Sequence, residues 1–480
     1  MIYDVIIIGG GVIGCSIARY LSRYKGNFLV VERHNDVGDE TSSANSAIVH
    51  SGYDPKPGTL KAKFNVLGNK MMPNVCKELD VDFDKIGSIT VALNDEDLDT
   101  LKMLNERAKI NGVNAKFLTT EETIALEPNI NKDIKGSLYC EDAGIVSPFN
   151  LTVSFMENAM DNGVKLKLNT EIKEIKRENS GIYILKDQND NIYETKFLIN
   201  ASGVNSEVVT RYLEEPSFKI IPTKGEYILL DHFDTNFVKH TLFMCPSKVG
   251  KGVLVSPTTS YNYIVGPSAT ETYEGDTSCD TSTFTFLREK AKSLVKDIPY
   301  TQTIKGFAGV RANNDHNDFI IEESKKNPGF FLVAGIMSPG LASSPAIGEY
   351  VSNYVADKLK LSKNESYNPC VKPHLKLKEM SIDSYNELIK EEPSYGKFVC
   401  RCEKVSEGEI LDAIRRNCGA TTVKGVRKRT RAGFGKCQGT FCQMQVVHLL
   451  SKELKKDVKE INFSDEGTEI CIKDSKEGDL

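Results

Sequence analysis

The first 32 residues constrain the fold of this chain more than any other segment. Residues 4–8 (DVIII) are apolar and mostly β-branched, as in a buried parallel strand. A turn with the spacing G-x-G-x-x-G follows, with glycines at Gly9, Gly11 and Gly14. A helix then leads to a second apolar strand at 28–31, which ends at Glu32, an acid that can accept hydrogen bonds from ribose hydroxyls. The segment predicts a βαβ unit that binds a dinucleotide at the helix N-terminus.

Residues 195–206 (TKFLINASGVNS) add a second indication of dinucleotide binding. An apolar strand ends there in small residues that include Ser202 and Gly203. This looks like the second fingerprint of flavoproteins, in which a strand end and its turn pass close to the cofactor. Together, the two segments favour FAD over NAD.

Composition excludes several classes of protein. With 480 residues, the chain is too long for one compact domain. A net charge of −5 gives no sign of nucleic-acid binding. No apolar run approaches the roughly 20 residues that span a bilayer, and no signal peptide precedes the first strand. We therefore expect a cytoplasmic protein, with any membrane association through a partner.

Further segments resemble the D-amino-acid-oxidase superfamily, and most of all its short glycerol-3-phosphate oxidases, followed by the L-2-hydroxyglutarate dehydrogenases. The resemblance runs from residue 1 to about residue 360. It implies an α/β fold in which a Rossmann-like FAD-binding domain is interleaved with an antiparallel-sheet substrate domain. The segments that carry it, in chain order, are residues 40–70, 242–269, 306–321 and 335–347.

The resemblance also implies roles for individual residues. His50 would be the base that takes the hydroxyl proton of the substrate, and Lys251 and Arg311 would hold its anionic end. Ser338 would complete the pocket, in a turn before a helix that we expect to start near Pro345. Further residues implied at the cofactor are Arg33, Ser42, Ser46, Gly335, Gly340 and Leu341.

Each of these assignments has a competing interpretation. His50 could be an ordinary loop or core histidine, or could attach covalently to the flavin. Lys251 could be a hairpin lysine, and Arg311 could pair with a surface acid such as Asp315. Ala312 stands where relatives often have proline, which leaves the shape of that loop open.

The substrate follows from the same resemblance. Residues 40–43 (ETSS) match the glycerol-phosphate enzymes, whereas the hydroxyglutarate enzymes have a longer histidine-rich stretch. The sequence therefore favours oxidation of sn-glycerol 3-phosphate to dihydroxyacetone phosphate. An L-2-hydroxyglutarate dehydrogenase and a non-enzymatic electron-transfer subunit remain alternatives.

Two cysteine pairs near the C-terminus indicate a metal centre. Their pattern is C-x-C, 34 residues, then C-x4-C, with cysteines at Cys400, Cys402, Cys437 and Cys442. Four thiolates can bind a [2Fe–2S] cluster or zinc, although C-x-C is tighter than most zinc sites. Residues 400–405 (CRCEKV) and 429–442 resemble the bacterioferritin-associated-ferredoxin-like [2Fe–2S] domain. Cys418, between the pairs, matches no ligand position.

A basic run lies between the cysteine pairs and has two interpretations. It comprises Lys424, Arg427, Lys428, Arg429, Arg431 and Lys436. It could be a solvated surface, or it could offset an anionic cluster or bind an acidic electron acceptor. A one-electron cluster in the chain suggests a dehydrogenase that delivers electrons to another redox protein rather than an oxidase.

Together with the two resemblances, the sequence predicts three domains, a linker and a C-terminal tail. The FAD-binding domain comprises residues 1–75, 142–215 and 302–360, and the substrate domain comprises 76–141 and 216–301. We expect a linker at 361–394, a small iron–sulfur domain with four cysteine ligands at 395–450 and a charged tail at 451–480.

Overall fold

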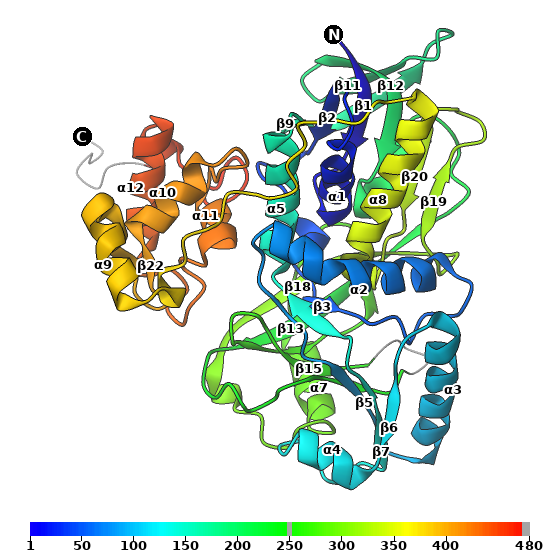
Figure 1. Cartoon of the computed structure of the whole chain (residues 1–480), viewed down its shortest axis with the longest axis vertical. Helices are drawn as coiled ribbons and strands as arrows, with labels where there is room; N and C mark the ends of the chain where they lie inside the picture. Colours follow the sequence, from blue (N-terminus) through cyan, green and yellow to red (C-terminus); the bar gives the residue numbers. More distant parts are fainter. Residues whose placement is uncertain (247–251, 473–480) are drawn as a thin grey trace.

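The computed structural model describes residues 1–246 and 252–472. They form two sheet-based regions stacked along the long axis and a small helical region beside the first of them (Figure 1). The predicted fold class is confirmed: a mixed α/β chain with a separate cysteine-containing C-terminal region.

The first sheet has eight strands, with β1 (Ile2–Ile8) at its centre. β1 pairs in parallel with β2 (Phe28–Val31) and β12 (Ile192–Asn200), and Val5 to Ile7 are fully buried. Parallel strands covered on both faces need such apolar runs. The other strands of this sheet are β9 (Lys165–Lys167), β10 (Ile172–Arg177), β11 (Tyr183–Asp187), β19 (Ile320–Glu323) and β20 (Phe330–Ala334).

Helices α1 (Val12–Leu21), α5 (Pro148–Asp161) and α8 (Gly340–Leu359) pack together on the first sheet, and α2 (Leu60–Glu78) crosses α8 (Figure 1). Small residues permit the close crossings. A Cβ on Gly68 would lie 2.1 Å from the carbonyl oxygen of Ala342. This packing brings the N-terminal ends of α1 and α8 to the same edge of the first sheet. The candidate site lies at that edge.

The second sheet has nine strands and is antiparallel except for the parallel pair β5–β14. Helices α3 (Asp95–Asn111), α4 (Thr120–Leu126) and α7 (Thr281–Ala291) flank it. Its strands are β5 (Ser88–Ala92), β6 (Lys116–Leu118), β7 (Gly136–Cys140), β13 (Ile220–Leu230), β14 (Thr241–Met244), β15 (Leu254–Pro257), β16 (Tyr263–Gly266), β17 (Thr270–Glu271) and β18 (Thr303–Asn314). A three-stranded sheet of β3 (Ile48–Val49), β4 (Phe83–Asp84) and β8 (Gly144–Val146) lies between the two regions.

The position of β18 corrects the expected boundary at residue 302. β18 pairs with β13 from Thr303 to Asn314, so the second sheet continues about twelve residues further than expected. The segment resembles cofactor-binding sequences because it contacts the loop at residues 40–46, here named the cofactor loop, where the Thr41 hydroxyl donates to the Val310 carbonyl at 2.5 Å. β18 can make that contact as a strand of the second sheet.

The C-terminal module (residues 398–470) has its own apolar core. Its elements are β21 (Phe398–Cys400), β22 (Val405–Ser406), α10 (Glu407–Arg415), α11 (Val423–Thr430) and α12 (Gln443–Leu454). The described part of the expected tail, up to residue 472, belongs to the module: Ile461 is buried in this core, and Lys424 donates its backbone N–H to the Phe463 carbonyl. The expected linker also contains an amphipathic helix, α9 (Ile382–Glu391). Within the described ranges, no helix combines the length and the apolar character that crossing a membrane requires.

Candidate functional site

The glycine turn between β1 and α1 has the geometry that close approach of a ligand requires. Gly9 has φ of +108°, and a Cβ there would lie 2.5 Å from the Ala201 carbonyl oxygen. A Cβ on Gly14 would lie 1.9 Å from the Gly9 carbonyl oxygen. By contrast, a Cβ on Gly11 would meet only the Ser42 hydroxyl, at 3.3 Å. Gly9 and Gly14 therefore serve the packing of strand and helix, and Gly11 leaves the helix N-terminus open.

A cleft at this turn brings together residues far apart in the sequence. Glu32 lies at its floor, where its carboxylate accepts from the Gly10 N–H at 2.6 Å and the His34 N–H at 2.9 Å. Burial raises the pKa of Glu32, although these two hydrogen bonds oppose the shift. Seven residues expected at the cofactor line the cleft: Gly9, Gly11, Glu32, Arg33, Ser42, Ser202 and Gly203. Their convergence is what a bound dinucleotide needs.

The sequence analysis missed charged residues at the rim of this cleft. His34 and Glu40 share a hydrogen bond of 2.9 Å, and both line the cleft. The bond from Glu40 raises the pKa of His34 to about 9. Glu40, despite its burial, has its pKa lowered to about 2 by His34 and Arg33. Arg33 also pairs with Glu274 at 2.8 Å, which joins the rim to a loop of the second region. No local motif signals these pairs.

His50 lies directly after β3, at the junction of the two regions. Its backbone carbonyl accepts from the side-chain amides of Asn65 at 2.6 Å and Asn69 at 3.2 Å, both on α2. Its ring stacks on Phe243, with centroids 5.7 Å apart. These contacts hold the imidazole in place, and α2, which supplies the two amides, crosses α8.

Arg311 extends from β18 beside the cofactor loop. One guanidinium nitrogen donates to the Ser268 carbonyl at 2.6 Å, and its buried Nε has no protein hydrogen-bond partner within the described residues. Ser46, which is predicted at the cofactor, hydrogen-bonds Tyr227. Burial raises the pKa of Tyr227, while Arg311 and Ser46 oppose the shift. Asp315 instead accepts from the Lys219 N–H, so it is not the partner of Arg311. The guanidinium therefore has donors free for an anion.

The loop before α8 contains two predicted site residues, Gly335 and Ser338. Two more, Gly340 and Leu341, are the first residues of α8. Gly335 has φ of +61°, and a Cβ there would lie 1.9 Å from the Asn314 side-chain nitrogen. α8 begins at Gly340 and not near Pro345. The helix tolerates Pro345 because the Leu341 carbonyl, which a backbone N–H would normally satisfy, accepts from the Ser344 hydroxyl at 2.9 Å. No side chain among the described residues caps the N-terminus; the Gly340 N–H donates to the Met337 carbonyl at 2.7 Å, and the N–H groups of Leu341 and Ala342 can stabilise an anion.

Lys251, the other cation expected at the substrate, lies outside the described residues. Its assignment stays a prediction.

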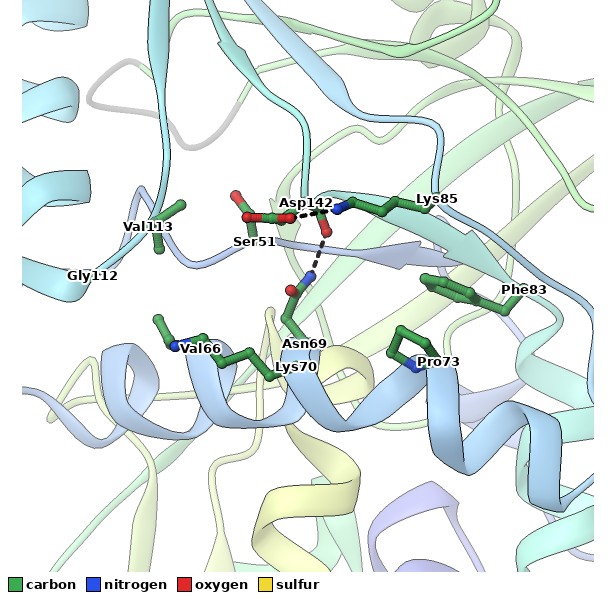
Figure 2. Close-up of a pocket in the computed structure, with 10 residues that line it drawn as sticks. All are labelled: Ser51, Val66, Asn69, Lys70, Pro73, Phe83, Lys85, Gly112, Val113 and Asp142. Carbon is green, nitrogen blue, oxygen red and sulfur yellow. Dashed lines mark hydrogen bonds and ion pairs between the residues drawn. The ribbon is translucent and has the colours of Figure 1, made fainter.

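A second cavity, of about 290 Å³, is lined by Asn69 of α2 and by Ser51, Lys85 and Asp142 of the facing segments (Figure 2). Asn69 reaches across it to donate to the Asp142 carbonyl at 2.8 Å, and Asp142 pairs with Lys85 at 2.6 Å. Among the residues that line it, Ser51 follows His50 in the sequence and Asn69 donates to the His50 carbonyl. The cavity holds none of the predicted site residues, so the catalytic assignment does not rest on it.

The four cysteines of the C-terminal module form two pairs. Cys402 and Cys437 have sulfurs 3.7 Å apart, which is about the edge of a tetrahedron with metal–sulfur bonds of about 2.3 Å. Cys442 donates to Cys400 and lowers the pKa of Cys400 to about 6. No three of these described sulfurs lie within 4.8 Å of one another, as one zinc ion would require. Two separate pairs suit a cluster with two metals.

A buried arginine lies beneath the cysteine loop. Arg427 donates to the Gln438 carbonyl at 3.0 Å and to the Gln443 side chain at 3.1 Å. Burial lowers its pKa, while the neighbouring thiols of Cys400, Cys437 and Cys442 oppose the shift. The guanidinium is thus placed to offset negative charge on the four thiolates.

Two other cations of the basic run lie where the module contacts the first region. Lys428 and Arg429 are buried against the first region, where Lys428 pairs with Asp36 at 2.8 Å and Asp39 at 3.0 Å, and Arg429 pairs with Asp36 at 2.7 Å. Neither predicted interpretation covers these two residues, because they join the module to the FAD-binding region. Sequence separation of about 390 residues hides such a pairing.

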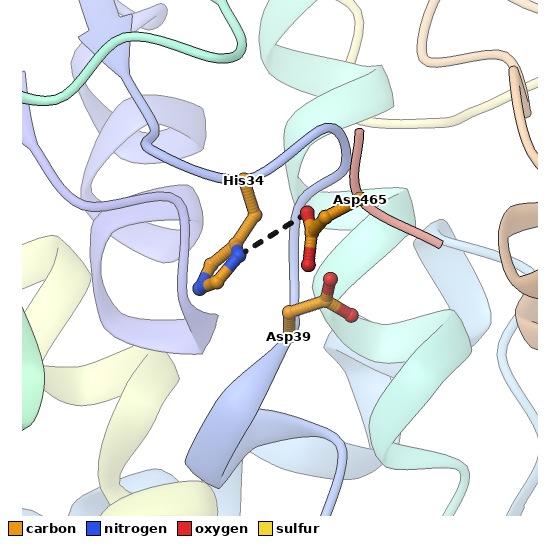
Figure 3. Close-up of side chains that lie close together, drawn as sticks. All are labelled: His34, Asp39 and Asp465. Carbon is orange, nitrogen blue, oxygen red and sulfur yellow. Dashed lines mark hydrogen bonds and ion pairs between the residues drawn. The ribbon is translucent and has the colours of Figure 1, made fainter. Parts of the chain in front are cut away.

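His34, Asp39 and Asp465 also meet at this junction (Figure 3). His34 is 3.3 Å from Asp465, but Asp39 already binds Lys424 and Lys428. The acidic charge is therefore compensated by protein cations, and the group links the module to the cleft.

Comparison with known proteins assigns the family. Residues 4–354 match the family described as "FAD dependent oxidoreductase", and residues 398–452 match the "BFD-like [2Fe-2S] binding domain". The chain belongs to the FAD-dependent oxidoreductase family and is an oxidoreductase with FAD and a [2Fe–2S] cluster as cofactors. The glycine cradle and the paired thiolates fit these two groups.

Particular relatives narrow the comparison. A glycerol 3-phosphate dehydrogenase of Caloramator mitchellensis is 43% identical over 99% of both chains. The dithionite-reduced L-alpha-glycerophosphate oxidase from Mycoplasma pneumoniae with FAD bound has a TM-score of 0.74 and 31% identity, covering 77% of this chain and 98% of that one. An L-2-hydroxyglutarate dehydrogenase of Escherichia coli is 28% identical over 56% of this chain and 64% of its own length.

Proposed function

We propose that the chain oxidises sn-glycerol 3-phosphate to dihydroxyacetone phosphate and passes the electrons through FAD and the [2Fe–2S] cluster to another redox protein. The observation that carries the substrate assignment is the 43% identity, over nearly the whole of both chains, to a glycerol 3-phosphate dehydrogenase. The aligned region therefore spans both the cleft and the cysteine module of this chain.

Arg311 is the residue that we assign to the anionic end of the substrate. Its guanidinium is half-buried, is anchored at one nitrogen by the Ser268 carbonyl, and keeps an unpartnered Nε within the described residues. A planar guanidinium binds phosphate or carboxylate oxygens through parallel hydrogen bonds. Lys251 would add a second cation.

His50 is the residue that we assign to proton transfer. Histidine is the side chain that most often acts as a general base, because imidazole can accept a proton near neutral pH. As the carbonyl of the product forms, His50 takes the hydroxyl proton and the hydride leaves the same carbon. FAD supplies the hydride acceptor when bound. The uncapped N-terminus of α8 would stabilise negative charge at the flavin.

The alternative substrate is L-2-hydroxyglutarate, whose dehydrogenase from Escherichia coli matches about half of the chain. Arg311 would bind a carboxylate as well as a phosphate. The match to this relative does not extend over the whole chain, which makes it the second candidate.

An anaerobic titration of the holoenzyme, followed by visible absorbance, tests the substrate. We expect sn-glycerol 3-phosphate to bleach the flavin and L-2-hydroxyglutarate to leave it oxidised. The variant Arg311→Lys keeps the charge but loses the planar fork, so it should need more substrate for the same bleaching. A flavin that stays oxidised with glycerol 3-phosphate contradicts the proposal.

The fate of the electrons has a separate test. An enzyme that delivers electrons to a protein partner should react slowly with oxygen once reduced. Rapid, stoichiometric peroxide formation by the reduced holoenzyme would show an oxidase instead.

A further inference from the structure

The two cysteine pairs differ in their access to solvent. Cys400 and Cys442 are buried, whereas Cys402 is exposed and Cys437 is half-buried. Electron transfer between proteins slows steeply with distance. The side of the metal site at Cys402 and Cys437 is therefore where electrons can pass to or from another molecule.

Apolar side chains surround that side of the module. Phe441, in the loop between Cys437 and Cys442, is 81% exposed, and Met444, the second residue of α12, is 41% exposed. The Met444 sulfur is 3.9 Å from that of Cys471, which brings Ile472, 79% exposed, to the same place. Single exposed apolar residues are ordinary, but aromatic and methionine side chains gathered at one place are typical of protein interfaces.

Unpaired cations lie at the same ligands. Arg401 stands between Cys400 and Cys402, Lys404 is two residues beyond Cys402, and Lys436 directly precedes Cys437. All three are exposed, and none forms an ion pair with the residues that the structure describes.

Other cations of the basic run are occupied. Lys428 and Arg429 pair with Asp36, and Arg431 pairs with Glu403 at 2.8 Å and contacts Asn262 of the second region. The chain as a whole carries a net charge of −5, so the positive charge at the exposed cysteines is a local feature and not a consequence of composition.

We propose that this face, defined by Arg401, Cys402, Lys404, Lys436, Cys437 and Phe441 and here named the exchange surface, docks an acidic one-electron carrier protein. The inference rests on the proposed function and names the class of its electron partner. Carboxylates of the carrier pair with the three cations, and an apolar area around its redox centre meets Phe441. Redox proteins of this kind use small interfaces, often below about 1,200 Å², in which charge sets the association rate.

The test measures electron exchange directly. A purified acidic two-[4Fe–4S] ferredoxin, reduced and freed of excess dithionite, is mixed anaerobically with the oxidised holoenzyme in a stopped-flow instrument. Absorbance reports reduction of the enzyme's cluster and flavin. Exchange uses the same surface in either direction, so this downhill reaction probes docking without requiring glycerol 3-phosphate.

The variant Arg401→Glu/Lys404→Glu/Lys436→Glu reverses the charge of the exchange surface. Its matched control, Lys132→Glu/Lys325→Glu/Lys326→Glu, makes the same change in net charge at exposed residues outside the module; two of these lie between β19 and β20, on the far side of the first region (Figure 1). At low ionic strength we expect the first variant to exchange electrons about tenfold or more slowly and the control within about twofold of wild type. The difference should shrink at about 0.5 M salt, where charges are screened.

Loss of the cluster could mimic this result, so iron content and the visible spectrum are measured on every variant. Should the triple reversal lose its cluster, Arg401→Gln/Lys404→Gln/Lys436→Gln removes the charges with less disturbance and should show an intermediate decrease. Phe441→Ser should slow exchange at high salt as well, because its contact is apolar.

Three outcomes overturn the proposal. Equal slowing of both triple variants would show an effect of overall charge. An unchanged rate in cluster-containing variants would place docking elsewhere. Binding to vesicles of 30 mol% phosphatidylglycerol in phosphatidylcholine is measured for the same variants. If the charge-reversed variant loses the vesicle binding of the wild type but exchanges electrons with ferredoxin at an unchanged rate, the face is a membrane contact. Flavin bleaching by glycerol 3-phosphate, measured separately, reports on the proposed function, which can fail without altering the exchange rates.

Discussion

The dinucleotide cleft and the cysteine site solve the same problem of holding a redox group by different means. The cleft collects residues from the first turn, the end of β2, the loop at 39–42, the turn before β10 and the segment after β12, which together span residues 8 to 212 of the sequence. The cysteine site draws its four ligands from one small module with its own core. One site depends on the assembled fold, and the other on local chain geometry.

The difference extends to the chemistry of binding. The cleft is shaped by the backbone and by glycines, which lack side chains. A Cβ at Gly14, for example, would clash with the Gly9 carbonyl. The cysteine site depends on four side chains, of which each pair suits one metal. A single substitution should therefore remove the cluster and spare the flavin.

Replacing one ligand gives the largest expected effect. Cys437→Ser should abolish the visible absorption of the cluster, because one metal loses a thiolate ligand. FAD content and the rate of flavin bleaching by substrate should stay within about twofold of wild type, because the cleft lies in another region. Cys418→Ala is the control: a buried cysteine between the pairs that should leave the cluster intact. Loss of FAD together with the cluster would contradict the separation of the two sites.

His50→Asn should lower the rate of flavin reduction by about 10²–10⁴-fold, the contribution typical of a general base. The asparagine keeps a polar side chain of similar reach, and the backbone contacts of residue 50 to Asn65 and Asn69 do not depend on the ring. Anaerobic stopped-flow absorbance measures the rate. Normal FAD and iron content would show that only the chemistry is affected, and a wild-type rate would remove His50 from the mechanism.

Asp36→Asn tests the junction between the two regions. It would leave Lys428 and Arg429 buried without their shared carboxylate, at a cost of about 3–5 kcal/mol in the free energy of unfolding. Denaturant unfolding followed by cluster absorbance and flavin fluorescence measures it. Asp465→Asn, at the half-exposed edge of the same junction, should cost about 1 kcal/mol or less. Equal costs would show that burial does not govern this network.

His34 should give the smallest effect, seen as a dependence on pH. Its pKa is raised from 6.5 to about 9 by Glu40, so its contribution to stability is complete below pH 6.5 and is lost as pH rises through about 9. The pair is partly exposed, which limits the contribution to about 1 kcal/mol. The difference in unfolding free energy between wild type and His34→Gln should therefore vanish between pH 6.5 and 9.5. A difference independent of pH would assign His34 a packing role.

Local patterns predicted much of the molecule. The glycine spacing with Glu32, and the two cysteine pairs, each indicate a ligand because the required residues lie close together in sequence. The resemblance added His50 and Arg311, whose roles stay predictions. By contrast, the extent of β18 could not be predicted, because its resemblance reflects contact with Thr41 and not the sheet in which it pairs.

The basic run shows where sequence reasoning ends. Six cations in 13 residues read as one feature, yet the fold assigns Arg427 to the cysteines, Lys428 and Arg429 to Asp36, and Lys436 to solvent. Which of these cations are buried depends on the docking of the module against residues about 390 positions away. No local periodicity encodes that contact.

The sequence by itself determined the kinds of group that this protein holds, because a phosphate cradle and a set of thiolate ligands are each specified within a short stretch of chain. Only the tertiary structure decided how the two are related: which acids neutralise the module's cations, which cysteines reach the surface, and which donors of Arg311 remain free. Those properties depend on burial and on pairing between distant segments, and the free energy of a charge is set by its neighbours in space.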